Sequence, residues 1–284
     1  MKKLITFLVV FSLAILLAAF LAPILYQFMP YFKFEKIFNR LLMIAALLVI
    51  AGFARLDQDF FKQCGLMERR GLLNHWLKGF FISIIILFLL IGFEFQLGAL
   101  KFSDTYQVTL KLICQALAAG LVVGLIEEVF FRGFVFLKLN RNLKSTQAAL
   151  ILTNLFYALV HFLRSGRPYV DETPTMFDSL RLIGASFHAF VQLDVYWPSM
   201  VGLFLFGLVL SFSFLRTRSL AIAMGLHGGA VFVLKLTSRW YVVEPHVSDL
   251  VYGGRGFYSG LLGWLFILFI GLVIHRLARP SETS

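Results

Sequence analysis

Charged residues are scarce in this chain. They make up 14% of its 284 residues, against roughly a quarter in soluble domains. Hydrophobic residues make up 60%, and the mean hydropathy is +0.85. These values exclude an ordinary soluble enzyme and indicate an all-α, polytopic transmembrane helix bundle. The net charge of +11 does not indicate nucleic-acid binding, because the basic residues fall mainly in short gaps between apolar runs, as in cytoplasmic loops.

Cysteine is also scarce. Cys64 lies in a basic stretch and Cys114 in an apolar run, so neither a disulfide framework nor a thiolate metal site is expected. The chain has no internal repeat and no low-complexity linker, so we expect a single integral-membrane domain over residues 1–284. Two lysines precede a first apolar run that reaches about Leu25. This run is too long for a typical signal peptide, and we expect an uncleaved transmembrane helix.

Apolar segments divide the chain into about eight expected membrane spans, of which the second is short for a span. They cover residues 4–28, 40–55, 76–97, 107–137, 147–163, 198–215, 219–238 and 258–276. With the N-terminus inside, 13 basic residues fall in the inside loops and 10 in the longer outside loops. This bias predicts a multi-pass protein of the inner (plasma) membrane with both termini in the cytoplasm.

One connection, residues 164–197, is unusually long and is expected on the non-cytoplasmic side. Five apolar residues recur within it at helical spacing: Met176, Leu180, Ile183, Phe187 and Phe190. The pattern predicts an amphipathic helix on the membrane surface. This helix would serve either as a lid or substrate-docking element or for packing alone.

Three charges interrupt the fourth apolar segment in the stretch LIEEVFFRGF: Glu127, Glu128 and Arg132. A charge at membrane depth costs several kcal/mol unless it is paired or faces a polar cavity. Glu128 and Arg132 are four residues apart with the acid first, so we expect them to pair on one helix. Glu127 is rotated by about 100° from Glu128. It is therefore a candidate functional residue, unless all three charges only form a network that holds helices together.

The fifth and seventh spans also carry polar residues. Asn154, Tyr157 and His161 recur along one face of the fifth. His227 lies in the seventh among glycines that leave room for a neighbouring backbone, namely Gly225, Gly228 and Gly229. At ~1.5 Å per residue from the inside ends, His227, Glu127 and His161 lie roughly 12, 16 and 22 Å deep. All three fall in the middle of a ~30 Å core, so we expect them in one cavity.

A glutamate with two histidines suits peptide hydrolysis in two ways. The carboxylate can take a proton from water while a histidine orients that water or stabilises the oxyanion. The same set, Glu127, His161 and His227, can instead hold a divalent metal ion such as zinc, which activates a bound water. The sequence leaves both possibilities open, so either no cofactor or a divalent metal is expected.

The motifs Glu127-Glu128-x-x-x-Arg132-Gly133 and Tyr157-x-x-x-His161, followed by the glycine-flanked His227, resemble the CAAX protease and bacteriocin-processing family of intramembrane endopeptidases. The resemblance covers about residues 115–235. It implies a bundle of eight helices with catalytic core spans at 107–238 and an active site inside the membrane. The substrate would be a peptide or membrane protein in the lipid bilayer, with no nucleic acid involved.

By this resemblance, Glu127 is the water-activating base, assisted by His161, and His227 stabilises the oxyanion. Glu128 and Arg132 are implied as supporting residues. Other intramembrane proteases fit less well, because the sequence has no His-Glu-x-x-His and no Gly-x-Ser-Gly motif.

Two positions depart from the family pattern. Tyr157 stands where the family usually has Phe, and Val231 stands where its third motif, His-x-x-x-Asn, has Asn. Asn154 or Tyr157 is then a candidate substitute for the missing donor. The departure leaves open a catalytically altered member that acts as a membrane immunity or partner-binding protein. A proton- or ion-coupled transporter that uses the same residues is a further alternative.

Overall fold

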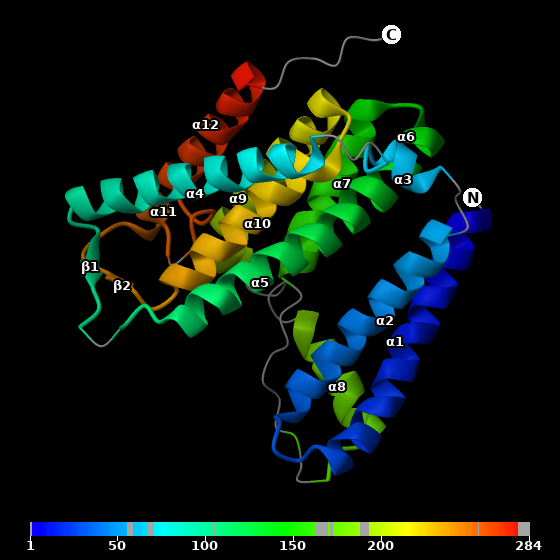
Figure 1. Ribbon diagram of the computed structural model, residues 1–284. Helices are drawn as coiled ribbons and strands as arrows, with labels where there is room; N and C mark the ends of the chain where they lie inside the picture. Colours follow the sequence, from blue (N-terminus) through cyan, green and yellow to red (C-terminus); the bar gives the residue numbers. More distant parts are fainter. Residues whose placement is uncertain are drawn as a thin grey trace. The chain divides into compact units, whose positions relative to one another are not determined.

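The computed structural model describes residues 2–55, 59–67, 71–104, 106–162, 170, 173–187, 193–254 and 256–277. These residues are mainly helical (Figure 1). The longer helices are α1 (Lys2–Phe28), α2 (Phe34–Arg55), α4 (Leu72–Gln96), α5 (Leu110–Glu128), α7 (Thr146–His161), α8 (Met176–Ser186), α9 (Leu193–Thr217), α10 (Leu220–Thr237) and α12 (Leu261–Leu277). Shorter helices are α3 (Phe60–Gln63), η1 (Val129–Phe136), α6 (Leu137–Leu143) and α11 (Asp249–Tyr252). The expected all-α polytopic bundle is confirmed.

Six described helical segments are long and apolar enough to cross a membrane. They are Val9–Phe28, Phe34–Phe53, Leu72–Gln96, Leu110–Leu143, Asp194–Thr217 and Leu220–Thr237. Two further apolar helices, α7 and α12, have 16 and 17 residues and fall just short of the length of a full span. From the sequence, the second apolar segment, residues 40–55, was expected to be short for a membrane span. That was wrong, because α2 begins six residues earlier than the apolar run and has 22 residues.

The chain folds into two compact units. One comprises Met1–Gln58 with Leu159–Val195, and the other Asp59–Ala158 with Tyr196–Ser284. The division falls inside α7, which is one continuous helix to His161. A single domain over 1–284, with catalytic core spans at 107–238, remains a prediction.

In the first unit, α8 packs against α1 and α2 through Leu182, which joins Ala19 and Phe38 in a buried cluster. The predicted amphipathic helix is present, but its packed face is not the predicted apolar stripe. Asp178, Ser179 and Leu182 are buried, whereas Met176, Leu180 and Phe187 are exposed; Phe190 lies outside the described residues. Ile183 packs against the buried cluster. The exposed members of the stripe face outward, where a membrane-surface helix would contact lipid.

In the second unit, α10 packs closely between α4 and α5. A Cβ on Gly225 would lie 2.0 Å from the Trp76 carbonyl oxygen of α4, and one on Gly229 would lie 2.5 Å from the Phe80 carbonyl oxygen. On the other side, a Cβ on Gly228 would lie 2.9 Å from the carbonyl oxygen of Gly120 in α5. The close backbone approach predicted for these glycines is confirmed. It is the small-residue packing that holds transmembrane helices together.

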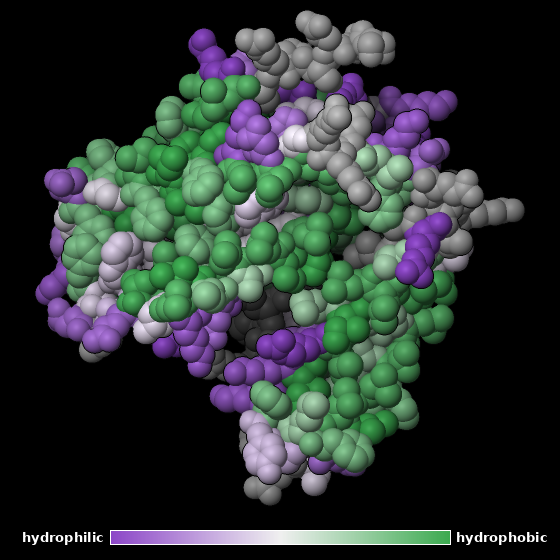
Figure 2. Space-filling model, viewed as in Figure 1, coloured by the Kyte–Doolittle hydropathy of each residue, from purple (hydrophilic) through white to green (hydrophobic). Residues whose placement is uncertain are grey.

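The outward faces of α4 and α5 are apolar. Figure 2 shows hydrophobic residues over both helices, with hydrophilic residues gathered toward the helix ends. Exposed side chains such as Phe81, Leu89, Leu117 and Leu121 contribute to this surface. A belt of this kind suits lipid contact. Beyond these helices, β1 (Leu100–Phe102) pairs antiparallel with β2 (Tyr241–Val243), a small sheet that the apolar pattern did not predict.

Candidate active site

Glu127 and Glu128 are the last two residues of α5, and the helix continues directly into the π-helical turns of η1. Such turns are rare and occur frequently at functional sites. Gly133 follows Arg132 within η1, at a point where a Cβ would lie 2.9 Å from Cys64 Sγ. The small residue after the arginine thus lets η1 pack against the segment that follows α3.

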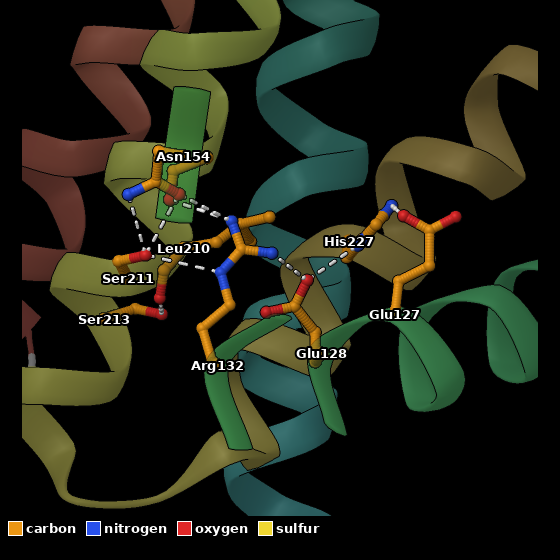
Figure 3. Close-up of polar contacts among 9 residues, drawn as sticks. Glu127, Glu128, Arg132, Asn154, Leu210, Ser211, Ser213 and His227 are labelled. Atoms are coloured by element: carbon orange, nitrogen blue, oxygen red, sulfur yellow. Dashed lines mark hydrogen bonds and ion pairs between the residues drawn. The ribbon is translucent and has the colours of Figure 1, made fainter. Parts of the chain in front are cut away.

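The predicted pair between Glu128 and Arg132 is present. Arg132 Nη1 donates to Glu128 Oε1 over 2.8 Å, and both side chains are 0% exposed. Arg132 also donates from Nη2 to the Gly207 carbonyl oxygen over 2.9 Å and to Asn154 Oδ1 over 3.1 Å. A buried guanidinium needs several hydrogen-bond acceptors to offset the free-energy cost of its desolvation. Arg132 is therefore anchored by α7 and α9 together (Figure 3).

Arg132 and its partners Glu128, Asn154 and Gly207 form a buried cluster, called the anchor below. Ser211 of α9 completes it. Its Oγ accepts from Arg132 Nε over 3.3 Å and from Asn154 Nδ2 over 3.0 Å. Asn154 Nδ2 also donates to the Leu150 carbonyl oxygen over 2.9 Å. The amide donors of Asn154 are thus engaged within the anchor, which argues against Asn154 as the substitute oxyanion donor. The sequence did not distinguish Ser211 from Ser199 and Ser213, the other hydroxyls of the same span.

His227 links this anchor to Glu127. Its Nδ1 lies 2.8 Å from Glu128 Oε1, the same oxygen that accepts from Arg132. An ionised carboxylate only accepts hydrogen bonds, so Nδ1 carries the proton of this bond. Nε2, on the other side of the ring, lies 3.8 Å from Glu127 Oε2. The two glutamates therefore flank one imidazole (Figure 3), although the helical rotation had suggested separate neighbours.

Aromatic rings hold the imidazole in place. Tyr157 and Phe206 each meet the His227 ring edge-on, with centroids 6.0 and 5.9 Å away. Tyr157 is 1% exposed, and the guanidinium carbon of Arg132 lies 4.7 Å from its ring centroid. Tyr157 thus contacts both the anchor and the imidazole. Phe206 had no signal in the sequence, because it is one of 33 phenylalanines.

His161, the last residue of α7, joins Glu127 and His227. Each of the three offers one ligand atom, and these atoms lie within 4.8 Å of one another. Glu127 is 28% exposed whereas Glu128 is fully buried. The sequence-predicted trio thus comes together, and its glutamate is the more accessible of the two.

The residues present fit a metal ion as well as a metal-free site. Two histidines and one glutamate are a ligand set of catalytic zinc. A metal-binding histidine usually donates its other ring N–H to a carboxylate, and His227 Nδ1 does so to Glu128. Val231, four residues after His227, is half-buried and places an apolar side chain where the family pattern has an amide.

Comparison with known proteins finds one family that the region around this site resembles. Residues 109–233 match the family described as Rce1-like, type II CAAX prenyl endopeptidase Rce1-like. The matched region contains all the motif residues, from Glu127 to His227. No curated protein and no solved structure matches the chain.

Proposed function

We propose that this multi-pass membrane protein cleaves peptide bonds by carboxylate-activated water, because its residues 109–233 match the Rce1-like family of type II CAAX prenyl endopeptidases. The observation that carries the proposal is the cluster of Glu127, His161 and His227 beside the buried ion pair of Glu128 and Arg132. The substrate is a peptide or a membrane-associated protein. The membrane is the plasma membrane, with both chain termini on the cytoplasmic side.

Glu127 is the proposed general base. It is the partly exposed glutamate of the pair, so water and substrate can reach it. Its carboxylate takes a proton from water, and the resulting hydroxide attacks the carbonyl carbon of the peptide bond. His161 lies within the same cluster, where it orients the attacking water. The proton held by Glu127 then passes to the leaving amine.

His227 is the proposed oxyanion donor, acting from Nε2 as an imidazolium. Its Nδ1–H is already committed to Glu128, so only the protonated ring has a second N–H to offer. With Glu127 and Glu128 ionised and Arg132 and His227 protonated, the four formal charges sum to zero. The sum stays at zero when the proton moves from water to Glu127 and the oxyanion forms. A buried site favours such balance, because a net charge there is costly.

A divalent metal ion is the second candidate for activating the water. Glu127, His161 and His227 would hold it, with Nε2 as the donor atom of His227. Such an ion supplies Lewis-acid activation of a bound water. The neutral His227 ring, with Nδ1–H on Glu128, presents the Nε2 lone pair that this role needs. Metal analysis of the purified protein, together with the effect of a chelator on cleavage, distinguishes the two candidates.

Two other functions are alternatives. Val231, in place of the family's Asn, is consistent with a non-catalytic, partner-binding protein. The same glutamate and histidines could also carry protons in a proton-coupled transporter. Exchange of Glu127 for Gln separates these from a protease. We expect Glu127→Gln to abolish cleavage of a prenylated CAAX peptide by the protein in lipid nanodiscs. In cells, membrane proteomics of wild type and variant then shows which peptide termini disappear.

The matched control is Glu94→Gln. Glu94 is also a buried glutamate of a transmembrane helix, at 7% exposure in α4, and it lies outside the site. We expect this variant to cleave as the wild type does. Wild-type protein with no Glu127-dependent terminus in any membrane fraction would overturn the protease proposal. Equal cleavage by wild type and Glu127→Gln would overturn the role of Glu127.

A further inference from the structure

A groove of about 820 Å³ lies in the second unit, between the first half of α4, the start of α10 and the end of α12. None of the Glu127, His161 and His227 side chains lines it. Its volume is within the range of about 300–1,000 Å³ that small-molecule sites occupy. The groove is thus large enough for a ligand and separate from the proposed catalytic cluster.

The groove has a polar end and an apolar end. Asn74, His75 and Lys78 line it near the start of α4, and Phe81, Ile82 and Ile85 line it further along. From Asn74 to Ile85 the helix rises by about 16 Å, which is half of a ~30 Å hydrocarbon core. The groove therefore runs through one leaflet, from the polar boundary to the middle of the membrane.

The charges at the polar end have one sign. Lys78 is exposed. Arg276 is also exposed and is adjacent to the lining residue Leu277 at the end of α12. No carboxylate is among the described residues that line the groove. Basic pockets between transmembrane helices bind the phosphates of anionic lipid headgroups. His75 and Asn74 add N–H donors for phosphate oxygens.

We propose that this groove binds one anionic glycerophospholipid of the adjacent leaflet. Its acyl chain lies along Phe81, Ile82 and Ile85, and its phosphate lies beside Lys78 and His75. A lipid held only by apolar contact would show no headgroup preference. A lipid whose phosphate lies beside Lys78 and His75 would show a preference for an anionic headgroup. The inference does not depend on whether the Glu127 site is catalytic.

Native mass spectrometry of the purified full-length protein tests the proposal, with dioleoyl phosphatidylglycerol and dioleoyl phosphatidylcholine added separately. We expect the wild type to retain phosphatidylglycerol more strongly. Lys78→Gln lowers that retention by about fivefold, and Lys78→Arg restores it. The matched control is Lys111→Gln, which removes a charge from the start of α5, away from the groove, and leaves retention unchanged.

A second variant tests the apolar end of the groove. Ile85→Trp fills it, and we expect reduced retention of both lipids with an unaltered melting temperature. Equal retention of the two lipids by the wild type would overturn the proposal, because the groove would then hold ordinary boundary lipid. Equal losses in Lys78→Gln and Lys111→Gln would also overturn it, as a sign of general surface attraction. So would normal retention by Ile85→Trp.

Discussion

The two sides of the His227 ring differ sharply. On the Nδ1 side, Glu128 and Arg132 are completely buried and joined over 2.8 Å, and Arg132 has further partners on α7 and α9. On the Nε2 side, Glu127 is partly exposed and lies 3.8 Å from the ring. Two glutamates adjacent in sequence therefore sit in opposite environments. One is enclosed in a network, and the other has a partly exposed side chain.

This difference separates structural from chemical roles. The acceptor oxygen Glu128 Oε1 is already shared by Arg132 and His227, so it holds the ring and does not have to move a proton. The carboxylate of Glu127 is closer to solvent and has a looser contact with the ring. Environment thus assigns different roles to neighbouring carboxylates, as it does in many enzymes that use two of them.

The largest expected effect is on the anchor. Arg132→Met leaves the Glu128 carboxylate buried without its cation, so we expect the protein to lose about 3–5 kcal/mol of stability. Thermal unfolding in detergent measures it. Arg181→Met is the control, because Arg181 is 66% exposed and lies 3.6 Å from Asp178, and loss of such a surface pair costs about 0–1 kcal/mol.

A double variant sharpens this result. Arg132→Met combined with Glu128→Leu removes both charges, so we expect it to be more stable than Arg132→Met alone. The anchor would be misassigned if Arg132→Met and Arg181→Met unfolded at the same temperature. Glu127→Gln, on the other side of the ring, should unfold within about 1 kcal/mol of the wild type.

The next effect is on the orientation of His227. Glu128→Gln weakens the bond that holds Nδ1, so we expect kcat to fall by about 10–100-fold with KM little changed. Nitrogen NMR of histidine-labelled protein should show a changed protonation pattern for the His227 ring. A lower kcat with an unchanged His227 signal would contradict the positioning role of Glu128. Glu94→Gln again serves as the matched control.

A smaller effect is expected at Val231. Val231→Asn places an amide one helical turn after His227, on the same face. An oxyanion donor contributes a factor of about 10²–10³ to kcat. The new amide has no neighbouring residues that position it, so we expect it to raise kcat by about tenfold or less. Peptide cleavage assays measure the gain, with Val231→Leu as the control that adds no donor. An unchanged or lower kcat would mean that the oxyanion forms away from this helix face.

Much of this site could be predicted because polar residues stand out in an apolar chain. The pairing of Glu128 with Arg132 follows from spacing alone. The close approach at Gly228 follows from the absence of a side chain. Other features depend on how distant helices pack. The bonds that Arg132 donates to Ser211 and Gly207 have no local signal, and neither has the Glu128–His227 bond, because the partners lie at least 75 positions apart.

The same limit applies to local geometry. The π-helical turns of η1 cannot be recognised from apolar spacing, because their residues are as hydrophobic as those of an α-helix. The face on which α8 packs is another feature that the sequence did not predict. The packed side includes Asp178 and Ser179, since the apolar residues that would normally form a core have lipid as an alternative environment.

The smallest expected effect concerns a carboxylate outside the site, at the start of α8. The backbone N–H of Thr175 donates to Asp178 Oδ2 over 2.8 Å, as does its hydroxyl. With the backbone bond as the main cause, this lowers the pKa of Asp178 below its ordinary value. A lowered native pKa means that the cap stabilises α8 fully above about pH 4 and is lost as the pH falls through the native pKa.

The cap contributes about 1 kcal/mol, so we expect the hydrogen-exchange protection factors at the start of α8 to fall about fivefold on acidification. Asp178→Asn should abolish this fall, since an amide does not titrate in this range. Equal acid sensitivity in wild type and variant would assign the effect to other carboxyl groups. Asp178 bonds to backbone within one turn, whereas Glu128 is held by α9 and α10 through Arg132 and His227. Acid should therefore loosen α8 locally before it disturbs the anchor.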